Sequence, residues 1–226
     1  MQNLPDMKPV FDRYKTVAHE ADAVFSRIQS EHRDCVTCSE GCSDCCHALF
    51  DLTLVEAVYM NDAFLRAFPS GMERSRILER AHTADREVHK IKHKAFKAQQ
   101  AGTDVDTILA ELAKLRIRCP LLDDSDRCLL YTHRPVTCRL YGVPTAINGK
   151  GHVCGKSTFL QGKPYPTASM DKIHERLISL SKDMAAHAGS GYTEIHTVLV
   201  PVSMALITSY DAKYFGVGLK AGRRND

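Results

Sequence analysis

The stretch Cys35-Val-Thr-Cys38-Ser-Glu-Gly-Cys42-Ser-Asp-Cys45-Cys46 decides the fold, because it places five thiols within twelve residues. A second group follows at wider spacing, namely Cys119, Cys128, Cys138 and Cys154. Thiolates this dense repel one another and oxidise readily, so a partner must hold them. The candidates are a metal ion, an iron–sulfur cluster or a set of disulfides.

Size and composition favour a metal over disulfides. A chain of 226 residues suits one domain with appendages and buries a core without disulfide staples. The N-terminus lacks the basic and apolar regions of a signal peptide, and no apolar stretch reaches the roughly 20 residues that span a bilayer. We therefore expect a cytoplasmic protein with reduced thiols, where metal is the more usual partner. Nine cysteines also cannot all pair within one chain.

Charge and motifs exclude several function classes. The formal net charge of +3 is too small to indicate a nucleic-acid partner, and no segment predicts a membrane partner. The chain has no glycine-rich phosphate loop, no G-x-S-x-G and no H-E-x-x-H. The sequence thus predicts a protein that is not an enzyme on its own.

Apolar periodicity predicts a mainly α fold. Helices are expected from about Pro9 to His32, from Leu54 to about Phe68, from Ser70 to about Gln100, from Thr103 to Leu115 and from Ser169 to His187. Capping boxes are predicted at Thr53–Glu56 and Ser70–Glu73. Residues 33 to 50 and 116 to 166 lose this periodicity and hold the cysteines. The segment from His196 to Phe215 fits either a strand or a helix begun at Pro201.

These patterns predict a helical domain wrapped around two irregular cysteine-bearing segments that together form a metal site. We expect an N-terminal amphipathic helix over residues 1–32, a cysteine-cluster metal-binding domain over 33–166 with a helical insert at about 70–115, and a C-terminal helical segment with a mobile tail over 167–226. Closing the loop between the two cysteine groups costs little compared with metal–thiolate bonding. The two groups should therefore meet in space.

The spacing within the first cysteine group is typical of metal binding. Cys35-x2-Cys38 and Cys42-x2-Cys45 each let two thiolates grip one metal from a single turn. The adjacent pair Cys45-Cys46 is more than one zinc site needs, because neighbouring side chains point apart. Such a pair indicates separate metal ions, or different corners of a polynuclear centre.

The second group carries a distinctive motif, Cys119-Pro-Leu-Leu followed by Cys128-Leu-Leu-Tyr-Thr-His-Arg-Pro-Val-Thr-Cys138-Arg-Leu-Tyr. Together with the Cys-x2-Cys-Cys run, it resembles the CxxCxxCC, or YkgJ-like, cysteine-cluster family of zinc- or iron-chelating proteins. The module also occurs in flagellin lysine N-methylases. The resemblance covers roughly residues 35 to 155.

The resemblance implies a chelating module. The metal-ligand positions that it implies are Cys38, Cys42, Cys45, Cys46, Cys119, Cys128, Cys138 and Cys154. Three residues separate Cys38 from Cys42, where the family pattern has two. Cys35 is an extra cysteine, either an alternative ligand or a free thiol. The flagellin methylases resemble this chain in their cysteine pattern and carry an iron–sulfur cluster, so an iron–sulfur cluster is slightly favoured over zinc.

Other polar residues have two interpretations each. Arg134 and Arg139 either offset thiolate charge or form salt bridges to Asp123, Asp124 or Asp126. His47 and His133 are auxiliary ligand candidates, whereas His89 and His93 fit a solvated helix face.

Three functions remain open. The first is a metal- or cluster-binding protein, with a protein partner allowed but not identified. The second is an S-adenosylmethionine-dependent protein (lysine) N-methylase-like enzyme. The third is a purely structural zinc module for protein interaction.

Overall fold

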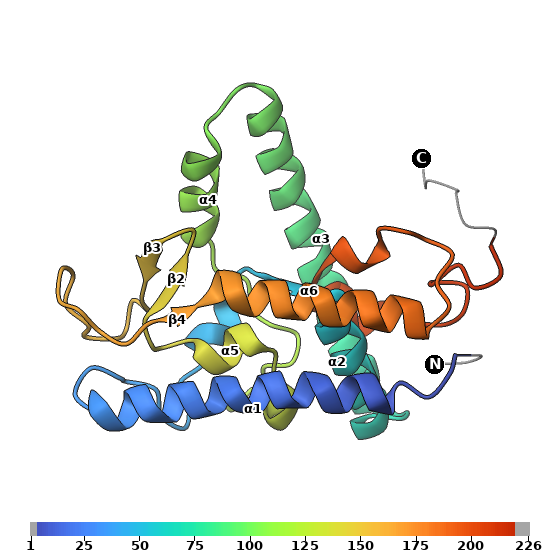
Figure 1. Cartoon of the computed structure of the whole chain (residues 1–226), viewed down its shortest axis with the longest axis horizontal. Helices are drawn as coiled ribbons and strands as arrows, with labels where there is room; N and C mark the ends of the chain where they lie inside the picture. Colours follow the sequence, from blue (N-terminus) through green and yellow to red (C-terminus); the bar gives the residue numbers. More distant parts are fainter. Residues whose placement is uncertain (1–3, 220–226) are drawn as a thin grey trace.

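The computed structural model describes residues 4–219 and is mainly helical, as predicted (Figure 1). Its α-helices are α1 (Lys8–Glu31), α2 (Leu54–Ala67), α3 (Met72–Gln100), α4 (Val105–Ala113), α5 (Val136–Leu140), α6 (Met170–His187) and α7 (Val202–Ile207). Short 3₁₀ turns are η1 (Asp44–His47), η2 (Tyr131–His133) and η3 (Ile195–Thr197). No helix among the described residues is both long and apolar enough to cross a membrane.

Between residues 4 and 219, five short strands form two small sheets. β1 (Asp51–Thr53) pairs antiparallel with β5 (Leu199–Pro201), with Leu52 opposite Val200. β2 (Thr145–Ile147) lies between β3 (Lys150–His152), which is antiparallel to it, and β4 (Ala168–Ser169), which is parallel. These pairs tie the irregular segments to the helices rather than forming a layer of their own.

The long N-terminal helix α1 buries one stripe against the rest of the molecule. Its apolar residues recur at the helical period, and the buried ones are Val10, Phe11, Tyr14, Val17, Ala18, Ala21 and Ile28. α1 packs on α5 and α6, and Figure 1 shows the three elements side by side. The predicted amphipathic helix is confirmed.

The central helix α2 is buried on nearly all sides. Its first turn has the predicted capping box: the Glu56 carboxylate accepts bonds from the Thr53 N–H at 3.2 Å and the Thr53 hydroxyl at 2.9 Å. Leu54, Val55 and Phe64 are fully buried. α2 thus forms the middle of the main hydrophobic core, to which α1, α6 and α7 also contribute.

Three predicted boundaries are corrected. α3 begins at Met72, and its N-cap is Gly71, with φ of 97°, rather than Ser70. The predicted capping box of Ser70 and Glu73 is therefore wrong. α4 is capped by Asp104, which accepts from the Thr107 N–H at 3.0 Å, and ends at Ala113 rather than Leu115. The C-terminal segment, for which a strand and a helix were both considered, contains one of each: β5 ends at Pro201 and α7 follows it.

α3 and α4 form a hairpin that rises away from the rest of the protein (Figure 1). The first part of α3 reaches the main core through Ile77 and Ala81, and Ala84 and Val88 form a second small cluster with Ile117. α4 has no buried residue. The hairpin separates the two cysteine segments in the chain and leaves them free to meet at its base.

Candidate metal centre

The two cysteine segments are joined by their backbones. The Cys119 N–H donates to the Cys46 carbonyl at 2.7 Å, and the Ile117 N–H donates to the His47 carbonyl at 3.0 Å. An antiparallel bridge between Ala48 and Arg116 continues the contact. The prediction that the two groups meet in space is confirmed.

The first segment holds its thiols on a tight turn. Gly41, with φ of 83°, reverses the chain, and η1 then carries Cys45 and Cys46. The Cys46 N–H bonds to the Ser43 carbonyl at 2.9 Å. This turn presents both adjacent thiols to the same side of the molecule.

The second segment positions its thiols through a hairpin-like turn and a short helix. A bridge pairs Leu122 with Cys128, and the Leu129 N–H donates to the Leu121 carbonyl at 2.9 Å. Cys138 lies on α5. The first N–H of α5, that of Val136, donates to the buried Glu56 carboxylate at 3.0 Å. α2 therefore fixes the start of the helix that carries Cys138.

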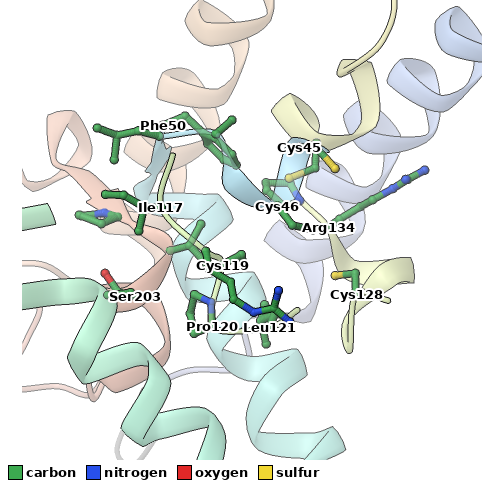
Figure 2. A pocket seen from close by; sticks show the side chains of 18 of the residues that line it. Cys45, Cys46, Phe50, Ile117, Cys119, Pro120, Leu121, Cys128, Arg134 and Ser203 are labelled. Carbon is green, nitrogen blue, oxygen red and sulfur yellow. The ribbon is translucent and has the colours of Figure 1, made fainter. Parts of the chain in front are cut away.

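Five of the predicted ligands line one cavity, namely Cys45, Cys46, Cys119, Cys128 and Cys138. Figure 2 shows Cys45, Cys46 and Cys128 at one end with Arg134, and Phe50, Ile117 and Ser203 at the other. The walls between them are mostly apolar, with Leu49, Met60, Ala84, Val88, Leu121 and Val202. Soft sulfur donors thus gather, half-buried, in a cavity with mostly apolar walls.

The sulfur atoms in this cavity shift one another's pKa values. Hydrogen bonding from Cys138 and then from Cys46 lowers the pKa of Cys45 well below its ordinary value. Donation to Cys128 and Cys45 raises the pKa of Cys46, and donation to Cys45 raises that of Cys138. Burial raises the pKa of Cys119 to about 12. A bound metal ion would replace these protons, because thiolates and not thiols are the ligands.

A family model matches residues 37–155, which is more than half of the chain and contains every predicted ligand. The chain belongs to the CxxCxxCC family. This family is described as a "Putative zinc- or iron-chelating domain". No curated protein and no solved structure matches the chain.

Metal binding is therefore the general property of this CxxCxxCC domain, and its donor set fits that property. Thiolates suit zinc, copper(I) and iron–sulfur clusters and disfavour hard cations such as Mg²⁺. Yet no group of three or more His, Cys, Asp or Glu side chains among residues 4–219 converges as metal ligands do. The five thiols line one cavity, but their present positions do not yet form such a group.

The remaining predicted ligands, Cys38, Cys42 and Cys154, form an outer group, of which Cys154 contacts Asp44. The Cys154 thiol donates to the Asp44 carboxylate at 3.4 Å, and the Cys38 thiol donates to the Tyr141 carbonyl at 3.6 Å. Burial and then the neighbouring Cys42 raise the pKa of Cys38 to about 11. None of Cys38, Cys42 and Cys154 lines the inner cavity. The structure thus divides the eight predicted ligands of the CxxCxxCC domain into five and three.

Asp44 is a buried residue that sequence reasoning missed. Its carboxylate accepts from Arg116 at 2.7 Å and from the Tyr141 hydroxyl at 3.1 Å. Burial raises the pKa of Asp44, but the bonds from Arg116, Cys154 and Tyr141 outweigh burial and leave that pKa below its usual value. The only signal in the sequence was its position one residue before Cys45.

Cys35 lies apart from both groups. Its carbonyl accepts from the Thr158 N–H at 3.0 Å, and its side chain is half-buried against the main core. The structure therefore uses the backbone of Cys35 to fasten the loop after Cys154.

The two arginines of the second motif have a different partner from the one predicted. Arg139 is buried and pairs with Asp22 on α1, while its other nitrogens donate to the carbonyls of Arg134 and Thr132 at 2.8 and 2.7 Å. Arg134 lies 3.7 Å from Asp22 and stacks over the Tyr131 ring at 4.0 Å. Arg134 also lines the cavity, while its ion pair is with Asp22 and not with Asp123, Asp124 or Asp126 as predicted.

The candidate histidines take structural roles. His47 Nδ1 bonds to the Ser43 carbonyl at 3.0 Å. His133 Nδ1 bonds to the Tyr59 hydroxyl at 2.8 Å. His89 and His93 stack with ring centres 6.3 Å apart on the exposed face of α3. None of these four lines the thiol cavity.

Proposed function

We propose that this protein is a metal-binding cysteine-cluster protein whose two distant cysteine groups jointly hold an iron–sulfur cluster or zinc through thiolates. The observation that carries this proposal is the set of five thiols around one cavity, drawn from both segments. Thiols gathered this closely gain most from a cation that removes their protons and offsets their charge. The cation would also cross-link residues that lie more than 70 positions apart in the chain.

We propose Cys45, Cys46, Cys119, Cys128 and Cys138 as the inner ligands. Cys38, Cys42 and Cys154 are proposed as ligands of the outer group, beside Asp44. Metal binding would require the Cys38 and Cys154 thiols to leave their present acceptors. Arg134, at the cavity wall, would offset the negative charge of the loaded site.

An iron–sulfur cluster is the favoured occupant. Cys45 and Cys46 are adjacent in the chain, yet both line the same cavity. Neighbouring side chains reach different corners of a polynuclear centre more readily than one small ion. Zinc is the second candidate, because a tetrahedral thiolate site suits both.

The experiment that tests this function is anaerobic purification followed by iron, zinc and acid-labile sulfide analysis with a visible spectrum. Iron with matching sulfide and absorbance near 400 nm would support a cluster. Tightly bound zinc with a featureless spectrum would support the zinc alternative. A protein that binds neither metal would overturn the proposed function.

We also propose that residues 33–166 are the metal-binding unit, with the α3–α4 hairpin as an insert and α1 and α6 as its supports. The packing of α1 on α5 supports this arrangement, since α5 carries Cys138. Nine free thiols are best kept reduced in the cytoplasm, which is the proposed compartment.

A further inference from the structure

A surface groove lies against the outer side of the thiol cavity. It runs between α3 and the segment that carries Cys119, with a volume of about 440 Å³. Its polar lining consists of three arginines, two glutamates and one threonine: Arg76, Arg80, Arg118, Glu79, Glu87 and Thr83. The groove is therefore large enough for a small organic anion. Of its three guanidinium groups, that of Arg118 is paired with Asp126, and those of Arg76 and Arg80 lie near Glu79 and Glu87 in the lining.

The groove and the thiol cavity share a wall. Ala84, Arg118, Cys119 and Pro120 line both hollows. Figure 2 shows Cys119 and Pro120 at the edge of the cavity, with Cys119 between the other thiols and Pro120. A molecule held in the groove would thus lie beside Cys119, on the opposite side from the remaining thiols.

Two of the three guanidinium groups are held in place by backbone carbonyls. Arg80 Nε donates to the Pro120 carbonyl at 3.0 Å, and Arg118 Nη2 donates to the Asp123 carbonyl at 2.6 Å. Within residues 4–219 neither Arg76 nor Arg80 forms an ion pair, whereas Arg118 pairs with Asp126 at 3.7 Å. Arg80 is already ordered by its bond to Pro120, so it loses little entropy when it binds an anion.

We propose that this groove is a binding site for a small oxyanion, a carboxylate or a phosphate, with Arg76 and Arg80 as its principal cations. The guanidinium fork matches two oxygens of either group. Glu79 and Glu87 at the rim weaken the site and limit it to ligands that present their negative charge to the arginines. The site does not depend on the metal, so its test is independent of the proposed function.

The test is calorimetric titration of the full chain with citrate and, separately, with inorganic phosphate, at constant ionic strength set by chloride. Wild-type protein should bind at one saturable site. The double variant Arg76→Ala/Arg80→Ala should bind about tenfold more weakly or worse, because two charge-assisted contacts are lost. Arg76→Glu breaks none of the hydrogen bonds that hold the groove in place, so this variant should fold and should lose affinity to a similar extent. Glu79→Gln/Glu87→Gln should bind severalfold more tightly.

The matched control is Arg27→Ala, an exposed arginine on α1 far from the groove in the chain. Its affinity should equal that of the wild type. Binding of citrate alone would identify a carboxylate site, and binding of phosphate alone or of both would identify a phosphate or general oxyanion site. No saturable binding of either anion, or equal weakening by Arg27→Ala and Arg76→Glu, would overturn the proposal.

Discussion

The backbone N–H of Cys119 donates to the carbonyl of Cys46 at 2.7 Å, so a cysteine of one group is bonded directly to a cysteine of the other. Helices α2, α3 and α4 lie between these residues in the chain. Their side chains line one cavity together with three further cysteines. Because this contact is made by main-chain atoms, it exists without metal–thiolate bonds and holds the two segments in register.

Serine at an inner cysteine should remove metal and lower stability together. Cys138→Ser and Cys119→Ser each delete one thiolate of the proposed inner set. When free metal stands at about 1,000 times its Kd, losing the site costs about 4 kcal/mol of folding stability. Metal analysis and thermal unfolding of the purified variants measure both effects.

The control for these variants is Cys35→Ser, since Cys35 does not line the cavity. Its metal content should equal that of the wild type. Full metal content in both Cys119→Ser and Cys138→Ser would show that the ligand assignment is wrong.

Glu56→Gln should weaken the contact between α2 and α5 and lower the stability of the protein. The carboxylate accepts from Thr53 at one end and from the Val136 N–H at the other, and it is fully buried. An amide in its place turns an N–H₂ group towards a donor, which costs about 1–3 kcal/mol. Because Val136 begins the helix that carries Cys138, metal affinity should fall as well.

Urea unfolding compares this variant with Glu175→Gln, which changes an exposed glutamate on α6. The control should lie within about 0.5 kcal/mol of the wild type. Equal stability of Glu56→Gln and the control would mean that the hydrogen bonds of the buried Glu56 carboxylate contribute nothing to the free energy of unfolding.

The contrast between local and distant partners explains what the sequence could predict. The spacing of Thr53 and Glu56 predicted the start of α2, because a capping box is local. The same spacing at Ser70 and Glu73 failed, since Gly71 ends the preceding loop in a left-handed conformation. The second role of Glu56, as acceptor for Val136, depends on packing between distant segments. No pattern in the sequence predicts such a contact.

The candidate site shows the same division. The cysteine pattern predicted that the two cysteine groups meet, and this is confirmed, whereas the ligand set that the family resemblance implies stays a prediction. It did not predict that five thiols would separate from the other three, nor that Asp44 would be buried between Arg116 and Tyr141. For Arg139 the expected carboxylates were near in sequence, whereas the true partner, Asp22, lies on α1. Tertiary packing selected it.

Asp22→Asn should destabilise the protein by about 1–3 kcal/mol. Arg139 is buried, and the substitution leaves its guanidinium charge without a counter-charge. The partial exposure of Asp22 keeps the cost below that of a fully buried pair. Asp183→Asn breaks the exposed pair with Arg13 and should cost no more than about 1 kcal/mol. Chemical unfolding measures the stability of the two variants side by side. Equal losses of stability would refute the assignment of Asp22 as the counter-charge of Arg139.

Stability should also depend on the protonation of His133. Burial, and then the positive charge of Arg66, lower the pKa of His133 below its usual 6.5. A group whose folded-state pKa is lowered contributes stability that is fully present above the unfolded value and is lost as pH falls through the folded value. We therefore expect part of the stability to be lost as pH falls below 6.5.

His133→Asn retains an acceptor for the Tyr59 hydroxyl but cannot take up a proton, so its loss of stability over the same pH range should be smaller. His82→Gln, an exposed site on α3, serves as the control and should follow the wild type. The measurement is urea unfolding at several pH values between 7.5 and 5, and parallel curves for the wild type and His133→Asn would contradict the prediction.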